Sequence, residues 1–143
     1  MTYRKWIYED IMGIAKLEEQ CFQDPWNFRM LAESFCSENT RTCAATEDGN
    51  LVGYGFLILA GEDADLANIA VDGGFRRRGI AEKILEFLET EARAAGTRRI
   101  FLEVRVSNSP AISLYLKSGY AGAYARKRYY GNGEDALVMR KQL

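Results

Sequence analysis

The sequence contains no histidine, and this single absence excludes several kinds of active site. A Ser-His-Asp or Cys-His nucleophilic site needs an imidazole as its base, and most zinc sites need at least one imidazole ligand. Cysteine is scarce too, since the three cysteines are odd in number and show no CxxC spacing. They indicate reduced thiols rather than a disulfide framework. We expect Cys21, Cys36 and Cys43 to be small core residues, and we expect no metal.

The chain also lacks a long apolar run and a large net charge. No run approaches the about 18 residues of a transmembrane helix, and the N-terminal MTYRKWIYED has no apolar signal segment. A net charge of −1 gives no global basic field, so neither nucleic acid nor a membrane is expected as a partner. We expect a cytoplasmic protein. Its 143 residues, 48% of them hydrophobic, suffice for one packed domain, 1–143.

Apolar periodicity and turn signals predict elements in the order β-α-α-β-β-β-α-β-α-β-β. Strands are expected at 2–8, 41–46, 51–60, 65–71, 99–106, 120–130 and 134–141, and helices at 10–22, 27–37, 79–95 and 109–118. Asn27 is a candidate N-cap of the second helix, and Ser109 suits the N-cap of the fourth. The order predicts an α+β (mixed α/β) fold with antiparallel hairpins and at least one βαβ crossover.

The stretch 75–84, FRRRGIAEKI, places three arginines and a glycine at the start of a predicted helix. The first helical turn leaves backbone N–H groups unpaired and carries about half a positive charge, so an anion is stabilised there. Gly79 would let the backbone approach such a ligand closely. A bound polyanion such as a pyrophosphate would relieve the repulsion between the arginines and the helix dipole. A solvated basic loop is the alternative, and composition alone favours neither.

Two familiar phosphate motifs do not fit this stretch. Gly74 and Gly79 have the spacing of a Walker A loop, but Ile80 and Ala81 stand where Lys and Ser or Thr are needed. The G-x-G-x-x-G pattern of a dinucleotide site is also absent. The sequence therefore argues against both NTP hydrolysis and a Rossmann site.

Glu103 stands in the middle of a predicted strand. Alternation places it on one face with Phe101 and Arg105, opposite an apolar face. A carboxylate between apolar neighbours is costly unless it is paired or functional. From the residues alone, a solvent-facing Glu103 paired to a cross-strand cation is slightly favoured.

Longer motifs carry a family resemblance. Residues 76–81, RRRGIA, match the R/Q-x-x-G-x-G/A loop of the GNAT N-acetyltransferases. NIAVDGGFRRRGIA, LEVRVSNSPAISLY and RYYGNGEDALVM together resemble the ribosomal-protein alanine N-acetyltransferases of the RimI type. The resemblance covers essentially the whole chain. It implies a GNAT-like fold, with a mixed, mostly antiparallel sheet of about seven strands and four helices.

The resemblance also implies acetyl-CoA as the co-substrate and suggests where it binds. The backbone of Ile69, Ala70 and Val71 is expected to pair with the pantetheine arm between two splayed strands, with an N–H near Val71 polarising the thioester carbonyl. Asn108 is expected to contact the CoA arm, although it could instead cap the following helix. The pyrophosphate is expected at the arginine loop, on Arg76, Arg77, Arg78, Gly79, Ile80, Ala81 and Glu82.

The same resemblance implies direct attack of an amine on the thioester. Glu103 would act as general base and Tyr115 as general acid. Tyr115 could otherwise be one aromatic residue on a helix whose Ile112, Leu114 and Leu116 are core. An α-amino group, with a pKa of about 7.7–8.0, is an easier acceptor than a lysine side chain at about 10.4.

The acceptor is expected between two loops. Pro25 and Trp26 lie where family members hold the substrate N-terminus, and Tyr129 and Tyr130 match a tyrosine pair that lines the peptide channel. Aromatic packing at strand ends is the alternative for these residues. The implied function is acetylation of the N-terminal α-amine of a protein, most simply a ribosomal protein with alanine first. The alternatives are acetylation of a small amine and a non-catalytic acyl-CoA-binding module.

Overall fold

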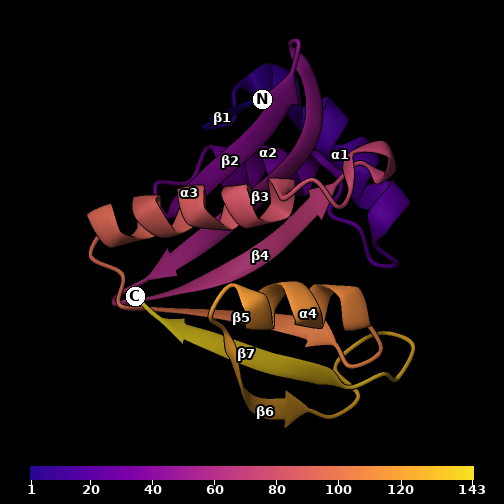
Figure 1. Ribbon diagram of the computed structural model, residues 1–143, viewed down its shortest axis with the longest axis vertical. Helices are drawn as coiled ribbons and strands as arrows, with labels where there is room; N and C mark the ends of the chain where they lie inside the picture. The colour runs from indigo at the N-terminus through magenta and orange to yellow at the C-terminus, as the bar shows by residue number, and fades with distance from the viewer.

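All 143 residues are described by the computed structural model, whose strands form a single seven-stranded sheet in the order β1-β2-β3-β4-β5-β7-β6 (Figure 1). Neighbouring strands run antiparallel except β4 and β5, which are parallel. The predicted class and element order are therefore confirmed. The elements are β1 (Thr2–Arg4), α1 (Ile11–Cys21), α2 (Phe28–Phe35), β2 (Thr40–Glu47), β3 (Asn50–Ala60), β4 (Asp63–Val71), α3 (Ile80–Ala94), β5 (Arg99–Arg105), α4 (Ser109–Lys117), β6 (Ala121–Arg126) and β7 (Ala136–Gln142).

The ends of some elements differ from the expectation for local reasons. Asn27 does cap α2, because its Oδ1 accepts a hydrogen bond from the Met30 N–H at 2.9 Å. The cap of α4 is Asn108 rather than Ser109, which is already the first helical residue. β6 ends at Arg126, four residues earlier than expected. Shortly after it, Arg128 has a φ of 51° and donates its N–H to the Asp135 side chain instead of to a strand.

Helices cover both faces of the sheet. On one face, the apolar stripe of α3 packs on β2 to β5 in a cluster that also holds Tyr115 and Tyr120. On the other face, α1 and α2 pack on β2 to β4 around Trp6, Tyr54 and Phe56. Each fully buried Leu or Ile in these clusters contributes about 1.5–3 kcal/mol. The two clusters fix the positions of the helix termini that surround the site.

Two expectations about the core were wrong. Of the three cysteines only Cys43 is buried, while Cys21 is half-buried and Cys36 is exposed; all three are free thiols. Leu116 is 56% exposed, because α4 turns Tyr115 inward and Leu116, the next residue, faces away from the core. None of the helices combines the length and the apolar character needed to cross a membrane.

Candidate active site

The parallel pair β4 and β5 separates after a short contact. Only three residue pairs join the strands, from Asp63–Arg99 to Asp65–Phe101. Beyond them β4 carries a bulge at Ala67 and continues to Val71, while β5 continues to Arg105 without pairing to β4. Figure 1 shows the two strands close together near the C-terminus and diverging from there. A wedge-shaped gap therefore opens in the middle of the sheet.

Backbone groups of β4 point into this gap. The Asp72 N–H donates to the Val52 carbonyl of β3 at 2.8 Å. Because hydrogen-bonded and non-hydrogen-bonded pairs alternate in an antiparallel ladder, the N–H and C=O of Val71 point away from β3, and so do those of Ile69. The backbone of Ala70, between them, faces β3. Of the three residues expected to pair with a pantetheine arm, Ile69 and Val71 thus turn their N–H groups into the gap, while the Val71 carbonyl accepts a hydrogen bond from Arg76 Nε at 3.4 Å.

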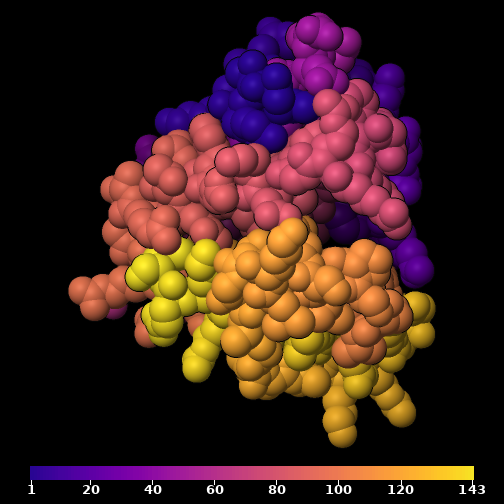
Figure 2. All heavy atoms as spheres, in the orientation of Figure 1, coloured from indigo at the N-terminus to yellow at the C-terminus, as the bar shows by residue number.

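A cleft of about 680 Å³ begins at this gap and runs between the start of α3 and α4. Figure 2 shows the hollow between the loop that precedes α3 and the α4 region. Apart from Arg78, every residue expected to bind acetyl-CoA lines it: Ile69, Ala70, Val71, Arg76, Arg77, Gly79, Ile80, Ala81, Glu82 and Asn108. The structure therefore brings two distant segments of the sequence, 69–82 and Asn108, to one cleft.

The start of α3 has the form of an anion site. Gly79 has a φ of 75°, a left-handed conformation that glycine adopts without steric cost. The first bond within the helix runs from the Lys83 N–H to the Gly79 carbonyl at 3.2 Å, so the N–H groups of residues 80–82 lack partners in the helix. A Cβ built on Gly79 would meet no protein atom within 4 Å. The open space beside these N–H groups suits a pyrophosphate.

The three arginines have different surroundings. Arg77 lines the cleft, while Arg76 also lines it and donates from Nε to the Val71 carbonyl at 3.4 Å. Arg78 instead forms an ion pair with Glu47 of β2 at 3.0 Å and stacks on the Phe75 ring. Arg78 is thus the one residue of the expected set that the structure places outside the cleft.

Lys117 lines the cleft as well, although no motif in the sequence singled it out. Its Nζ lies 3.1 Å from Glu82 Oε1, so an exposed ion pair joins α4 to α3 beside the expected pyrophosphate position. Ion pairs of this kind are weak. Lys117 brings a positive charge to the α4 wall of the cleft.

A second cleft, of about 530 Å³, meets the first at Tyr115 and Asn108. It lies between the loop that joins α1 to α2 (residues 22–27) and the loop that joins β6 to β7 (residues 127–135). Both candidate catalytic residues line it, together with three of the four residues expected to bind the acceptor: Glu103, Tyr115, Trp26, Tyr129 and Tyr130. Pro25 is exposed and lines neither cleft, although its neighbours on both sides line this one.

The electrostatic environment of Glu103 suits a proton acceptor. Burial, followed by the nearby charge of Asp65, raises the pKa of Glu103 above that of an ordinary glutamate, and Arg126 opposes this. The Arg126 Nε lies 3.6 Å from Glu103 Oε1, two strands away on β6. The cross-strand cation considered as an alternative is therefore present. Its contact is long and Arg126 is half exposed, so the carboxylate remains open to the cleft.

Tyr115 is the only buried residue of α4. Burial, with a smaller effect from Tyr130, raises the pKa of Tyr115 well above that of a free phenol. The ring packs edge-on against Tyr120 at a centroid distance of 5.9 Å. Its hydroxyl has no hydrogen-bond partner in the protein, and the residue lines both clefts. Tyr115 therefore stays protonated and available as a donor across the neutral pH range.

Sequence reasoning missed a buried carboxylate beside the second cleft. Glu18 of α1 has no solvent exposure. Its oxygens accept hydrogen bonds from the Tyr54 hydroxyl, from Asn68 Nδ2 at 2.9 Å and from the Trp26 N–H at 2.8 Å. Through Glu18, helix α1 and strands β3 and β4 hold the 22–27 loop in place. The pattern of α1 gave only a weak signal, since Glu18 falls among its apolar positions.

Replacing Glu18 with Gln is expected to lower the free energy of unfolding by about 1–3 kcal/mol, because an amide donor would then face three other donors. Burial raises the pKa of Glu18, so the folded protein binds this proton more tightly than the unfolded chain does. The contribution of Glu18 is then largest at low pH and falls as the pH rises above the unfolded value of about 4.3. The deficit of Glu18→Gln should be larger near pH 4 than near pH 7.

Urea unfolding of both proteins at the two pH values measures this difference. Glu19→Gln is the matched control, because Glu19 is the exposed neighbour on the same helix and its side chain makes no hydrogen bond or ion pair. Equal stability of Glu18→Gln and Glu19→Gln at both pH values would contradict the structural role of Glu18.

Comparisons with known proteins agree with this geometry. Residues 11–120 match the model of the acetyltransferase (GNAT) family. A Bacillus subtilis (strain 168) relative is 36% identical over 137 residues, covering 92% of this chain and 88% of the relative. The ribosomal protein bS18-alanine N-acetyltransferase of Escherichia coli (strain K12) is 31% identical over 133 residues, covering 91% and 89%. The crystal structure of the ribosomal-protein-S18-alanine N-acetyltransferase from Escherichia coli has a TM-score of 0.89 at 30% identity, covering 99% of this chain and 92% of that one.

Proposed function

The chain belongs to the acetyltransferase (GNAT) family and is an acetyl-CoA-dependent N-acetyltransferase; we propose that its acceptor is the N-terminal α-amine of a protein, namely a ribosomal protein S18 with alanine first. One observation carries the proposal. The cleft that contains Glu103 and Tyr115 opens between the 22–27 and 127–135 loops and meets the acetyl-CoA cleft at Tyr115. The name of the Escherichia coli relative supplies the acceptor. A ribosomal acceptor would place the reaction in the cytoplasm.

The residues of the chain would share the chemistry as follows. Acetyl-CoA, when bound, supplies the thioester that the amine attacks. Residues 69–71 hold the arm, and the free N–H of Val71 is available to polarise the thioester carbonyl. Glu103, directly or through a water molecule, takes a proton from the ammonium form of the acceptor, and the resulting neutral amine attacks the thioester carbon. Tyr115 gives its proton to the departing thiolate sulfur.

The acceptor cleft favours an extended chain end over a compact amine. It is lined by aromatic side chains from both loops, Trp26 on one side and Tyr129 and Tyr130 on the other. Trp26 is held by packing on Phe56 and by the Glu18 hydrogen bond to its backbone. Tyr129 and Tyr130 pack edge to face at a centroid distance of 5.1 Å. Rigid aromatic walls offer contact area along several residues of a peptide.

A CoA-release assay with three acceptors tests the proposal. The first acceptor is an alanine-starting peptide with the N-terminal sequence of S18, the second is the same peptide with a blocked N-terminus and one internal lysine, and the third is a polyamine. We expect turnover of the first alone, with intact-mass analysis showing one acetyl group on the α-amine. Preferred turnover of the polyamine or of the blocked peptide would overturn the proposed acceptor.

A further inference from the structure

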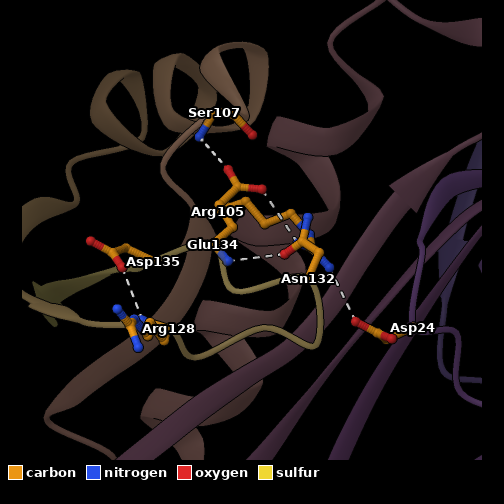
Figure 3. Close-up of polar contacts among 7 residues, drawn as sticks. All are labelled: Asp24, Arg105, Ser107, Arg128, Asn132, Glu134 and Asp135. Atoms are coloured by element: carbon orange, nitrogen blue, oxygen red, sulfur yellow. Dashed lines mark hydrogen bonds and ion pairs between the residues drawn. The ribbon is translucent and has the colours of Figure 1, made fainter.

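Arg105 connects the two loops that border the acceptor cleft (Figure 3). It lies two residues after Glu103 on the same face of β5. Its Nη1 donates to Asn132 Oδ1 at 3.0 Å and lies 3.4 Å from Glu134 Oε1, both in the 127–135 loop. Its Nη2 donates to Asp24 Oδ2 at 3.1 Å, in the 22–27 loop. This last contact is the only hydrogen bond or ion pair between the 22–27 loop and the β5–β7 half of the sheet.

The two sides of this bridge differ in strength. On the 127–135 side the guanidinium is 16% exposed, stacks 4.0 Å above the Tyr130 ring and meets a Glu134 carboxylate that is only 19% exposed. Glu134 is itself held by the Ser107 N–H at 2.9 Å. On the other side Asp24 is 68% exposed. Exposed ion pairs are weak and screened by salt, whereas a stacked, part-buried guanidinium with two acceptors in the same loop is held more firmly.

We propose that Arg105 is a positioning residue that determines acceptor specificity: anchored to the 127–135 loop, it reaches across the cleft to Asp24 and sets the width of the opening through which a peptide N-terminus enters. The inference rests on the proposed function and deepens it. The opening lies one strand repeat, about 7 Å, beyond Glu103 along β5. A closed contact admits an extended chain end with a small second residue, and releasing it admits bulkier ones.

Asp24→Asn is the sharpest test, because it removes the negative charge on the exposed side of the bridge and leaves the charge of Arg105 beside Glu103. We expect the KM for the alanine-starting peptide to rise about threefold to fivefold with the KM for acetyl-CoA unchanged. The kcat/KM preference for a small over a bulky second residue should fall by a similar factor. Asp48→Asn is the matched control, since the Asp48 side chain makes no hydrogen bond or ion pair and lies in the β2–β3 turn.

A double-mutant cycle separates positioning from general damage. Arg105→Met is expected to raise the peptide KM by about tenfold or more, and adding Asp24→Asn to it should change nothing further because the shared contact is already lost. Additive effects would mean that Asp24 and Arg105 act separately and would overturn the proposal. In Asp24→Asn, the dependence of kcat on pH should have the same shape as in the wild-type protein, because Glu103 is unchanged.

Hydrogen–deuterium exchange gives a readout that needs no activity. Asp24→Asn should speed amide exchange in residues 22–27 and leave residues 127–135 as in wild type, whereas Arg105→Met should speed both segments. In the wild-type protein, high salt should speed amide exchange in residues 22–27, as Asp24→Asn does. A wild-type protein that acetylates no peptide refutes the proposed function, while exchange still tests the bridge. If Asp24→Asn has the same amide exchange and the same peptide KM as Asp48→Asn, the role of the Arg105–Asp24 contact is refuted and the proposed function is not.

Discussion

Glu103→Gln is expected to lower kcat for acetylation of an alanine-starting peptide by about 10²-fold or more near neutral pH, because the amide cannot accept the proton of the ammonium group. Burial raises the pKa of Glu103, which makes the carboxylate a better proton acceptor for the ammonium group. The affinity for acetyl-CoA should barely change, because Glu103 lines the acceptor cleft and not the acetyl-CoA cleft.

The pH dependence of this deficit identifies the role. Without a base, only the fraction of acceptor that is already neutral can react, and that fraction falls about tenfold per pH unit below an amine pKa of about 7.7–8.0. The ratio of wild-type to Glu103→Gln rates should therefore grow from about pH 9 to about pH 6. Steady-state kinetics over this range, with acetyl-CoA binding measured by calorimetry, gives both quantities. A ratio that does not vary with pH, or a large loss of acetyl-CoA affinity, would assign Glu103 a structural role.

Gly79→Glu is expected to weaken acetyl-CoA binding by about two orders of magnitude. The new carboxylate would stand beside the unpaired N–H groups of residues 80–82, where it would compete with the pyrophosphate and repel it. The protein itself would tolerate the added atoms, since nothing lies within 4 Å of a Cβ at this position. Its left-handed conformation adds a stability cost of about 1–2 kcal/mol for any residue with a Cβ.

Gly49→Glu separates these two effects. Gly49 has a φ of 81°, has no atom within 4 Å of a built Cβ, and lies in the β2–β3 turn. The substitution adds the same charge and the same backbone cost away from the cleft. We expect both variants to lose similar thermal stability and only Gly79→Glu to lose acetyl-CoA affinity, as measured by calorimetry. Equal affinities in the two variants would place the pyrophosphate elsewhere.

Local signals in the sequence predicted most of the fold. The stripe of apolar residues in α3, the alternation in β5 and the turn at Asp48 and Gly49 all depend on neighbours a few positions away. The choice between adjacent caps went wrong at α4, because Asn108 and Ser109 are both good caps and only the backbone direction decides between them. The predicted end of β6 was wrong because Arg128 adopts a positive φ, which is uncommon for an arginine and cannot be predicted from the residue type.

The candidate site depended more on distant pairings. The residues expected to bind acetyl-CoA were identified from a sequence motif at a helix start, where an anion is stabilised. Their roles stay predictions. Arg78 could not be assigned from sequence, since its partner Glu47 lies 31 residues away. Glu18 and Arg105 have the same problem, with partners up to 50 and 81 residues distant. The sequence around a polar residue in a helix or strand does not indicate a partner far along the chain. The contacts of Glu18 and Arg105 were therefore found only in the structure.

From the short contact between β4 and β5 we expect the protein's abundance to depend on metabolism as well. Only three residue pairs join the strands across the middle of the sheet, and the backbone of Ile69 and Val71 beyond them is left for a ligand. A ligand that binds only the folded state stabilises it by about 2.7 kcal/mol at a hundred times its dissociation constant. When acetyl-CoA is scarce, the sheet loses this reinforcement and a larger share of the protein is open to proteolysis. The enzyme's lifetime in the cell, and not only its rate, is then expected to follow the acetyl-CoA supply.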